Sequence, residues 1–354
     1  MAYYQLKIKE IVRETADTIT IHFEQPAPNP IVYHPGQFLT LLLDIDGERI
    51  RRSYSMCSSP HADQTLAVSV KRVTGGKVSN FLNDRLRPGD TVEVMEPTGS
   101  FTPLLNPDHQ RHLVLLGGGS GITPLISIIK SVLATEGRSQ VSLLYGSRNR
   151  QSIIFKGQLD ALQAKHPGRF HVIHVLSQPE DDWEGYRGRL NQTLILKLLE
   201  QFSPDQPTTE YYLCGPEGLM EEVKRALSIQ RVSPERIHRE SFGAPVPVEK
   251  PMVLVAEEVS TVVVTREVTI LYEGSEYKFT VTPKQTILEA ALDLDIDLPY
   301  SCQSGMCTAC MGKCTSGKVK LDEEDGLSER ERKEGYVLTC VGHPLTNNVV
   351  IEID

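Results

Sequence analysis

The sequence predicts three domains in series: an antiparallel β-barrel, a doubly wound α/β domain and a small α+β domain. Short strands with alternating apolar residues occupy the first third of the chain, and a glycine-rich loop between a buried strand and a helix follows them. Five of the seven cysteines then lie in the last 53 residues. We expect the barrel at 1–105, the α/β domain at 106–244, a linker at 245–262 and the third domain at 263–354.

Composition and charge narrow the classes of function. With 40% hydrophobic and 23% charged residues, the chain has the composition of an ordinary globular protein. The formal net charge is −9, which argues against binding to nucleic acid. From Val263 to Asp354 nine Lys or Arg oppose sixteen Asp or Glu, a net of −7. This acidity indicates either a solvated surface or a face that attracts a positively charged partner.

Neither export nor membrane insertion is predicted. The first residues lack the apolar core of a signal peptide. The longest uncharged run, Leu113 to Ile129, is interrupted by four glycines and a proline, so it is not a membrane span. Cysteines gathered at one end favour a metal site over a disulfide framework, and we therefore expect a cytoplasmic protein in reducing surroundings.

The late cysteines form a C-x4-C-x2-C run, Cys302, Cys307 and Cys310, with Cys340 further on. This spacing is typical of plant-type [2Fe–2S] clusters, and thiolates are ligands that suit iron–sulfur chemistry. The alternative is a zinc site built from Cys307, Cys310, Cys314 and Cys340, although C-x4-C is not a zinc-finger spacing. We predict a cluster ligated by Cys302, Cys307, Cys310 and Cys340, with Cys314 as a small core residue.

The first domain is predicted to be antiparallel β-structure. Apolar residues alternate with polar ones from Ile19 to Phe23, from Leu66 to Val70 and from Val92 to Val94. Turn-forming Pro-Gly or Gly-Gly pairs separate these segments, at 35–36, 75–76 and 88–89. Short strands at this spacing suggest a barrel or a sandwich.

A motif inside this domain, Arg52-Ser53-Tyr54-Ser55, resembles the R-x-Y-S flavin motif of the ferredoxin-NADP reductase family. The resemblance implies that Tyr54 stacks on the flavin, that a serine hydrogen-bonds near flavin N5, and that Arg52 contacts the pyrophosphate. An aromatic ring and a guanidinium suit these tasks. Taken alone the motif is short, and a surface strand is the alternative interpretation. We predict cofactor binding by Arg52, Ser53, Tyr54 and Ser55, with Ser55 also catalytic.

A glycine turn further along supports this interpretation. Gly75 and Gly76 precede Lys77, Val78 and Ser79, and we expect a helix from Asn80 to Leu86. A helix start with a nearby lysine is a good phosphate site, and this arm resembles the pyrophosphate site of the family, which favours FAD over FMN. The predicted cofactor-binding residues of this region are Gly76, Lys77, Val78, Ser79, Val70, Lys71 and Arg72. Solvated edge-strand charge is the alternative for Lys71 and Arg72.

The second domain begins with a buried strand from His112 to Leu116, followed by a glycine loop and an apolar helical pattern. Strands and helices continue to alternate, which predicts a doubly wound α/β domain. We expect strands at 141–145, 170–176 and 211–213, and helices at 155–165, 194–201 and 219–227.

The glycine loop resembles the nicotinamide-nucleotide loop of the same family, although it lacks the strict G-x-G-x-x-G form and a tight turn is the alternative. The resemblance assigns nucleotide binding to Gly117, Gly118, Gly119, Ser120, Gly121, Ile122, Thr123 and Pro124. Cys214-Gly215-Pro216 follows the last apolar strand and resembles the C-G-P motif, whose cysteine lies beside the nicotinamide. A buried structural thiol is the alternative for Cys214.

Three further residues concern nucleotide choice. Ser147, Arg148 and Arg150 follow the second strand of this domain, where an acidic residue would favour NADH. Their presence favours NADPH, because arginines hold a 2′-phosphate; NADH remains possible if they only flank the adenine.

The end of the second domain carries two more candidates. Glu240 and Phe242 lie where related reductases bring a glutamate and an aromatic residue to the nicotinamide and flavin. The alternative is an ordinary strand that ends the domain. We predict Ser55, Cys214 and Glu240 as catalytic residues and Phe242 as a flavin contact.

The last segment resembles a plant-type ferredoxin domain, which implies an α+β, β-grasp-like fold. Its predicted elements are strands at 268–272 and 277–281, a helix whose apolar face holds Ile287, Ala290, Ala291 and Leu294, and a strand at 349–351. The order of flavin barrel, nucleotide domain and ferredoxin resembles reductase components of multicomponent oxygenases. It implies an oxidoreductase that passes electrons from NADPH through FAD and a [2Fe–2S] cluster to an oxygenase docked on the acidic domain.

The plan of the domains leaves several classes of partner open. The strongest resemblance is to reductases of di-iron oxygenases that act on phenylacetyl-CoA in phenylacetate catabolism. Reductases of steroid 9α-hydroxylases and alkane monooxygenases share the same plan. A stand-alone reductase for a cytochrome P450 or a ferredoxin is an alternative, and so is a redox sensor that binds a partner without turnover.

Overall fold

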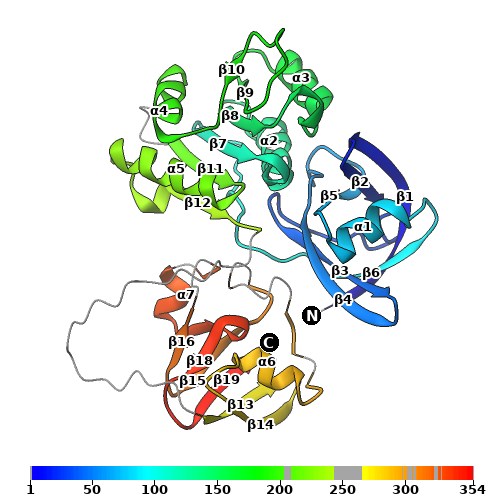
Figure 1. Cartoon of the computed structure of the whole chain (residues 1–354), viewed down its shortest axis with the longest axis vertical. Helices are drawn as coiled ribbons and strands as arrows, with labels where there is room; N and C mark the ends of the chain where they lie inside the picture. Colours follow the sequence, from blue (N-terminus) through cyan, green and yellow to red (C-terminus); the bar gives the residue numbers. More distant parts are fainter. Residues whose placement is uncertain are drawn as a thin grey trace. The chain divides into compact units, whose positions relative to one another are not determined.

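The computed structural model describes residues 2–202, 209–242, 265–296, 298–300, 305, 308–322, 326–327 and 329–353. They belong to two compact units, Ala2–Phe242 and Gly243–Asp354, which are described separately (Figure 1). The predicted linker at 245–262 lies outside the described residues. Among the helices of the described part, none combines the length and apolar character needed to cross a membrane.

The first domain is an antiparallel β-barrel, as predicted. Six strands form one sheet in the order β4-β3-β6-β1-β2-β5, and a bridge between Met56 and Val68 joins its two edges. β1 pairs with β6 through its first half and with β2 through its second, with a bulge near Ile8, so one strand bends around the barrel. The elements are β1 (Tyr3–Thr15), β2 (Thr18–Phe23), β3 (Phe38–Ile45), β4 (Glu48–Ser55), β5 (Leu66–Lys71), α1 (Lys77–Asp84) and β6 (Thr91–Met95).

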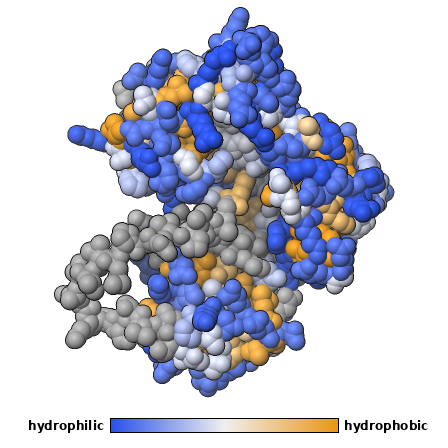
Figure 2. Space-filling model, in the orientation of Figure 1, coloured by the Kyte–Doolittle hydropathy of each residue, from blue (hydrophilic) through white to orange (hydrophobic). Residues whose placement is uncertain are grey.

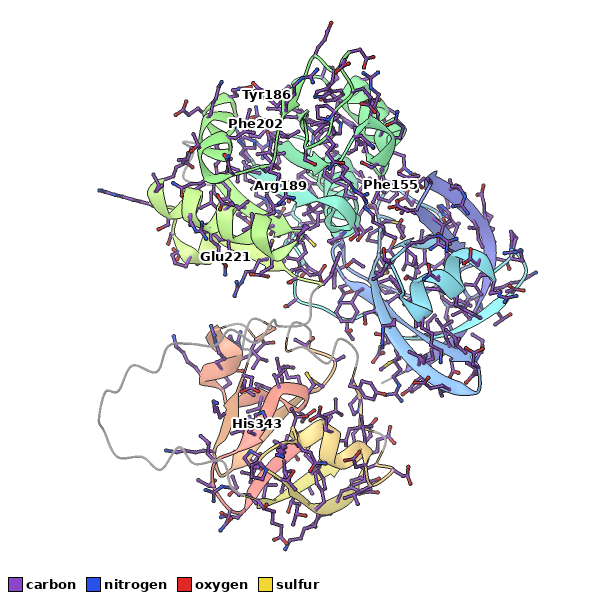
Figure 3. The ribbon with its side chains drawn as sticks, viewed as in Figure 1. Phe155, Tyr186, Arg189, Phe202, Glu221 and His343 are labelled. Atoms are coloured by element: carbon purple, nitrogen blue, oxygen red, sulfur yellow. The ribbon has the colours of Figure 1, made fainter. Side chains whose placement is uncertain are left out.

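The second domain is the predicted doubly wound α/β fold, with a parallel sheet in the order β10-β9-β8-β7-β11-β12. Phe155 packs with α2 and α3 on one face of the sheet, whereas Tyr186 and Phe202 pack with α4 and α5 on the other (Figure 3). The strands are β7 (His112–Gly118), β8 (Gln140–Ser147), β9 (Phe170–Leu176), β10 (Tyr186–Arg187), β11 (Thr209–Cys214) and β12 (Ile237–Glu240). The helices are η1 (Gly119–Gly121), α2 (Ile122–Thr135), η2 (Arg150–Ser152), α3 (Lys156–Lys165), α4 (Gln192–Gln201), α5 (Glu217–Ile229) and η3 (Pro234–Arg236).

A polar stripe on α2 joins these two domains. Ser127 Oγ donates to the backbone oxygen of Ser58 at 2.6 Å, and the hydroxyls of Ser131 and Ser59 lie 2.7 Å apart. Lys130 Nζ donates to the backbone oxygen of Cys57 at 3.1 Å. The serine hydroxyls are buried, so these bonds fix the barrel against the nucleotide domain. Hydrophilic residues cover most of the face of this unit that Figure 2 shows.

The C-terminal unit is the predicted α+β fold of the β-grasp type. Its main sheet has the order β14-β13-β19-β15-β17, and β13 and β19 form a parallel pair at its centre. The elements are β13 (Arg266–Tyr272), β14 (Ser275–Val281), α6 (Ile287–Leu292), β15 (Met311–Ser316), β16 (Val319–Leu321), α7 (Glu329–Lys333), β17 (Tyr336–Leu338), η4 (Thr339–Val341), β18 (Gly342–Pro344) and β19 (Val349–Ile353). His343, on the short β18 strand, pairs with Asp322 at 2.9 Å (Figure 3).

Two local predictions were wrong. The helix expected from Asn80 begins instead at Lys77, because Gly76 is its N-cap and the lysine already has helical geometry. Leu294 lies beyond the end of α6 and is 57% exposed, because the chain leaves the helix at its C-cap, Asp293.

Candidate active site

The three residues predicted to be catalytic meet where β4, β11 and β12 end. Ser55 Oγ donates a hydrogen bond to Glu240 Oε2 at 2.9 Å, across the junction between the barrel and the nucleotide domain. Cys214 is the register partner of Glu240 in the parallel β11–β12 pair, and of Gly117 in β7. The carboxyl ends of parallel strands are where α/β sheets bind their ligands. The fold therefore gathers these side chains from three separate parts of the sequence.

Burial sets the protonation state of the thiol in this group. Cys214 is fully buried, and burial, together with the nearby Glu240 carboxylate, raises the pKa of its thiol well above the usual value. A protonated thiol is a weak nucleophile but packs well against an apolar ring. The arrangement suits positioning of a planar group better than covalent catalysis.

The glycine loop lies directly against the cysteine. A Cβ on Gly121 would be 2.0 Å from the backbone oxygen of Cys214, a distance that no side chain could tolerate. Gly119 has a φ of 56°, in the left-handed region that favours glycine. Because both glycines are required by the backbone, the loop can pass between β11 and the start of α2.

The predicted loop residues divide into strand, turn and helix. Gly117 and Gly118 end β7, Gly119, Ser120 and Gly121 form the η1 turn, and Ile122, Thr123 and Pro124 begin α2. Thr123 Oγ1 donates to the backbone oxygen of Ser120 at 3.0 Å, and the Tyr145 hydroxyl donates to that of Gly119 at 2.7 Å. No acidic residue lies in the first turn of α2, so its amide groups and dipole favour an anion. Ile122, Thr123 and Pro124 are buried, which leaves a loop ligand mainly backbone to contact.

The rest of the C-G-P motif lies beside this loop. A Cβ on Gly215 would be 3.0 Å from the backbone nitrogen of Gly118, and Pro216 is the N-cap of α5. The two loops that follow β7 and β11 are therefore in contact, as a nucleotide site between these strands requires.

The R-x-Y-S motif occupies the end of β4. Tyr54 packs partly against the barrel core, and burial raises the pKa of its hydroxyl well above the usual value. The hydroxyls of Ser53 and Thr40 lie 2.8 Å apart, on the neighbouring strand pair. Arg52 is exposed and donates to the backbone oxygen of Arg51 at 2.7 Å. An aromatic ring held in place and an exposed guanidinium fit a flavin and its phosphates.

The second predicted arm lies at the start of α1. A Cβ on Gly76 would be 2.8 Å from Ser79 Oγ, and that oxygen accepts a hydrogen bond from the Val73 amide at 3.0 Å. Lys77 reaches Glu48 at 2.7 Å, and Val78 is buried in the barrel core. The residues present therefore fit a phosphate at the start of α1. Lys77 would exchange its ion pair with Glu48 for one with that phosphate.

The three residues predicted beside the same dinucleotide have different surroundings in the structure. Val70 is buried in the barrel core. Arg72 forms a paired contact with Asp84 and donates to Asn80 at 3.1 Å, so α1 already holds its guanidinium. Lys71 lies 3.7 Å from Asp17 and faces the glycine loop of the nucleotide domain.

The residues predicted to determine the choice of nucleotide also have different surroundings. Ser147 ends β8, and Arg148 lies 3.9 Å from Asp17 with its side chain 63% exposed. Arg150 instead pairs with Asp182 at 3.2 Å and stacks over Trp183, with its guanidinium carbon 5.6 Å from the ring centre. Arg148 is thus the arginine on the side of the glycine loop.

Two of the four predicted cluster ligands lie in the described part of the chain. Cys310 and Cys340 are both buried, and the backbone oxygen of Cys310 accepts hydrogen bonds from the amide and hydroxyl of Thr339 at 3.1 and 3.2 Å. The fold thus brings the two cysteine segments together. Cys302 and Cys307 lie outside the described residues. Cys314 is half-buried, and its thiol donates to the backbone oxygen of Ser316 at 3.2 Å.

One charged residue of this region is not among the predicted site residues. Asp17, in the turn between β1 and β2, lies between Lys71 and Arg148. A signal for its turn was present, since Thr15 and Thr18 flank an aspartate in the pattern of a side-chain-capped turn. Its two cationic neighbours come from distant parts of the chain and leave no local trace. Phe242 is the last residue of the Ala2–Phe242 unit, and its side chain is 49% exposed. An exposed aromatic side chain is available to contact a ligand.

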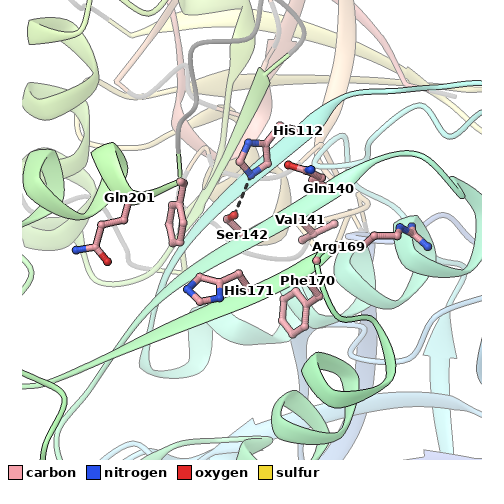
Figure 4. A pocket seen from close by; sticks show the side chains of 10 residues that line it. His112, Gln140, Val141, Ser142, Arg169, Phe170, His171 and Gln201 are labelled. Atoms are coloured by element: carbon pink, nitrogen blue, oxygen red, sulfur yellow. Dashed lines mark hydrogen bonds between the residues drawn. The ribbon is translucent and has the colours of Figure 1, made fainter.

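A separate cavity of about 310 Å³ lies at the other end of the parallel sheet. It is lined by residues such as His112 and Ser142, whose side chains are 2.8 Å apart, and by His171 (Figure 4). Parallel sheets bind ligands at the carboxyl ends of their strands, and His112 begins β7. This cavity contains no predicted site residue.

Three family models match successive parts of the chain. Residues 5–102 match an oxidoreductase FAD-binding domain, residues 115–225 an oxidoreductase NAD-binding domain, and residues 270–345 a 2Fe-2S iron-sulfur cluster binding domain. The last match favours the iron–sulfur interpretation of the cysteines over zinc.

Curated relatives match along almost the whole chain. It is 34% identical to one of the subunits of 1,2-phenylacetyl-CoA epoxidase of Escherichia coli, over 99% of this chain and 98% of the relative. It is 37% identical to the ferredoxin reductase component of 3-ketosteroid-9-alpha-monooxygenase of Rhodococcus rhodochrous, over 98% and 96%. The reductase of glycine betaine monooxygenase of Pseudomonas aeruginosa is 32% identical over 97% and 93%.

Solved structures share the fold. Phthalate dioxygenase reductase superposes with a TM-score of 0.60 at 24% identity, covering 99% of this chain and 98% of that one. An intact type IV self-sufficient cytochrome P450 monooxygenase gives a TM-score of 0.74 at 23% identity, covering 99% of this chain and 41% of that one. At these identities the likeness concerns architecture alone.

Proposed function

This chain belongs to the family of oxidoreductases that join an FAD-binding, an NAD-binding and a 2Fe-2S cluster binding domain, and from that premise we propose that it transfers electrons from NADPH to an oxygenase. The observation that carries the proposal is the hydrogen bond between Ser55 and Glu240 beside the buried Cys214. In support, this polar pair and the neutral thiol lie where the end of β4 approaches β11, β12 and the glycine loop.

The residues of this site bind and orient; they do not supply the redox chemistry. Bound FAD accepts a hydride and can release its electrons singly, which no side chain here can do. Ser55 presents its hydroxyl from the barrel, Glu240 holds that hydroxyl from β12, and Cys214 packs beside them as a neutral thiol. Preorganised polar groups of this kind lower a barrier by fixing the reacting rings at short range.

Holding FAD falls to residues of two barrel segments. Tyr54 provides an aromatic face and Arg52 an exposed guanidinium at the end of β4. Lys77 and the amide groups at the start of α1 would hold phosphate oxygens. Cys302, Cys307, Cys310 and Cys340 would ligate the cluster, and the buried positions of Cys310 and Cys340 support this assignment.

NADPH is the proposed donor because Arg148 lies on the glycine-loop side of the nucleotide domain and no acidic residue follows β8 directly. Arg148→Ala should raise the KM for NADPH while leaving the KM for NADH nearly unchanged. Arg150→Ala is the matched comparison, since Arg150 is held by Asp182 and Trp183.

The proposed partner is a di-iron oxygenase of the phenylacetyl-CoA epoxidase type, docked on the C-terminal domain. Full-length similarity to a protein of that epoxidase supports the choice. The net charge of −7 from Val263 to Asp354 favours a positively charged docking surface. The concentration of cysteines favours a reducing, cytoplasmic location.

The relatives that serve a steroid or a betaine monooxygenase make other oxygenases testable partners. Purified oxygenase components of the three classes, each supplied with its substrate and NADPH, would distinguish them by the rate of product formation. We expect product to form fastest with the epoxidase, and equal rates with all three oxygenases would contradict the proposal.

Separate roles for the flavin and the cluster predict that a cluster variant loses one activity and keeps the other. Cys307→Ser should leave NADPH-dependent reduction of ferricyanide largely intact, because that acceptor takes electrons at the flavin, and should abolish reduction of a one-electron protein acceptor. Cys314→Ser is the matched control and should change neither rate. Equal loss of both activities in Cys307→Ser would contradict the separate roles of flavin and cluster.

A further inference from the structure

We propose that the Asp17 carboxylate is an internal counter-ion that competes with a phosphate of the nicotinamide nucleotide for Lys71 and Arg148. The proposal rests on the nucleotide use proposed above and adds a residue that sets affinity. Asp17 lies in the β1–β2 turn of the barrel, Lys71 ends β5, and Arg148 follows β8 of the nucleotide domain. The carboxylate thus bridges cations of both domains.

The two oxygens of this carboxylate have different neighbours. Oδ1 accepts hydrogen bonds from the hydroxyls of Thr15 at 2.7 Å and Thr18 at 3.1 Å, so the turn itself fixes the side chain. Oδ2 lies 3.7 Å from Lys71 Nζ and 3.9 Å from Arg148 Nη2. These two distances are those of ion pairs without a direct hydrogen bond. Asp17 and Lys71 are half-buried and Arg148 is exposed, so the cations remain accessible to a competing anion.

Lys71 lies beside the glycine loop, and Arg148 is linked to it through the shared Asp17 carboxylate. A Cβ on Gly119 would be 3.9 Å from Lys71 Nζ, and Gly119 begins the turn that leads into α2. The first turn of α2 contains no acidic residue, so its dipole adds to the positive potential of the two side chains. A helix start with a lysine and an arginine attracts phosphate, and Asp17 is the anion that the barrel itself supplies there.

Removal of the carboxylate should therefore tighten nucleotide binding. Asp17→Asn keeps the size of the side chain and an oxygen for the two threonines, but it leaves both cations without this charge. We expect the FAD- and cluster-loaded full chain to bind NADP⁺ about 3- to 10-fold more tightly, with the gain shrinking as salt is raised. Isothermal titration calorimetry with NADP⁺ and with NAD⁺ measures this directly. An equal gain for both locates the competition at the pyrophosphate, through Lys71, and a larger gain for NADP⁺ locates it at the 2′-phosphate, through Arg148; either supports the proposal.

Asp63→Asn is the matched control. Asp63 also pairs a barrel carboxylate with a cation of the nucleotide domain, Lys130 at 2.9 Å, but its partner is in the middle of α2. Unchanged or weaker binding by Asp17→Asn, or an equal gain in Asp63→Asn, would overturn the proposal. If Asp17→Asn does not fold, Asp17→Ser replaces it, since serine also suits this turn. A wild-type protein that binds neither nucleotide would refute the proposed function itself, whereas normal wild-type binding with an unchanged variant refutes only the role of Asp17.

Discussion

Ser55 and Glu240 lie 185 positions apart in the sequence, yet their side chains share a hydrogen bond of 2.9 Å. Ser55 is buried, so its hydroxyl depends on the carboxylate for a partner on the protein side. Cys214 adds a thiol that stays protonated at neutral pH, because burial raises its pKa. The site therefore presents a neutral hydroxyl and a neutral thiol beside the Glu240 carboxyl group.

Ser55→Ala should slow hydride entry more than it weakens nucleotide binding. Loss of one preorganised polar contact at a reacting centre commonly costs about 100- to 1,000-fold in rate. Stopped-flow absorbance of the flavin after mixing with NADPH would measure the step, and calorimetric binding of NADP⁺ would provide the comparison. Ser100→Ala, at an exposed serine that is not among the predicted site residues, should leave the flavin reduction rate within about twofold of wild type. A rate in Ser55→Ala equal to wild type would show that the hydroxyl has no part in the transfer.

Single residues with a motif around them could be placed from the sequence, and those without one could not. Cys214 was assigned to a strand end by its neighbours Gly215 and Pro216, and β11 ends there. Asp17 has no such signature, because its partners come from β5 and from the loop after β8. Arg72 looked like a phosphate ligand in sequence, whereas the fold supplies Asp84 and Asn80 as its partners. Long-range charge pairing of this kind depends on tertiary structure.

Among the elements, the η1 turn and β11 make a close backbone contact at the site. Gly121 precedes α2 and passes so close to Cys214 that a Cβ would meet the carbonyl of that residue at 2.0 Å. Strand and turn are both backbone there, so neither can move aside without disturbing the sheet. The loop is thereby fixed at the height of the cysteine.

Gly121→Ala should destabilise the Ala2–Phe242 unit and displace the glycine loop from β11. Overpacking against backbone typically costs about 1–3 kcal/mol in the free energy of unfolding. Thermal unfolding followed by far-UV circular dichroism would measure the loss, and NADP⁺ affinity should fall with it. Gly137→Ala is the control, because a Cβ at Gly137 would meet nothing within 4 Å. Equal stabilities of the two variants would contradict the close approach.

Element types were predictable because the apolar periodicity is strong, and element ends were less so. The strand expected at 170–176 has those bounds as β9, whereas α1 begins three residues before the expected start. Helix ends depend on capping, and Gly76 offers no side-chain cap to mark the position. The fold class followed from the order of strands, loop and cysteines, which local errors do not change.

At the scale of the whole Ala2–Phe242 unit, a network of charged residues lies where the chain leaves the barrel and enters the nucleotide domain. Arg111 donates to buried Glu136 at 2.7 Å, to Glu210 at 2.6 Å and to the backbone oxygen of Leu104 at 2.8 Å. Tyr212 also donates to Glu210, at 2.9 Å. The network ties the connecting segment to β11 and to the C-terminal end of α2, so it should stabilise the junction between the two domains.

This network predicts a loss of stability in acid. Burial of Glu210 opposes its ionisation, but hydrogen bonds from His238 and Arg111 outweigh it and lower its pKa to about 2. An unfolded glutamate has a pKa of about 4.3, so the folded state binds fewer protons between these values. The contribution, at most about 3 kcal/mol, is complete above that unfolded value and is lost as pH falls toward 2.

Urea unfolding of wild type and of Glu210→Gln between pH 3 and 7 would test this. The difference in free energy of unfolding between the two proteins should be largest at neutral pH and should shrink below about pH 4. Glu200→Gln, at an exposed carboxylate in α4, provides the comparison. A wild-type advantage over Glu210→Gln that stays constant across this range would show that Glu210 titrates normally.

The whole molecule is proposed to carry electrons from a nucleotide to a cluster at its C-terminal end. An anaerobic titration of the purified, cofactor-loaded chain with NADPH, followed by visible absorbance, tests that claim most directly. The prediction is that flavin absorbance bleaches, that the broad cluster absorbance also falls, and that electron uptake exceeds what the flavin alone can hold. A flavin that bleaches while the cluster spectrum stays unchanged, or a protein that NADPH does not reduce, would contradict it.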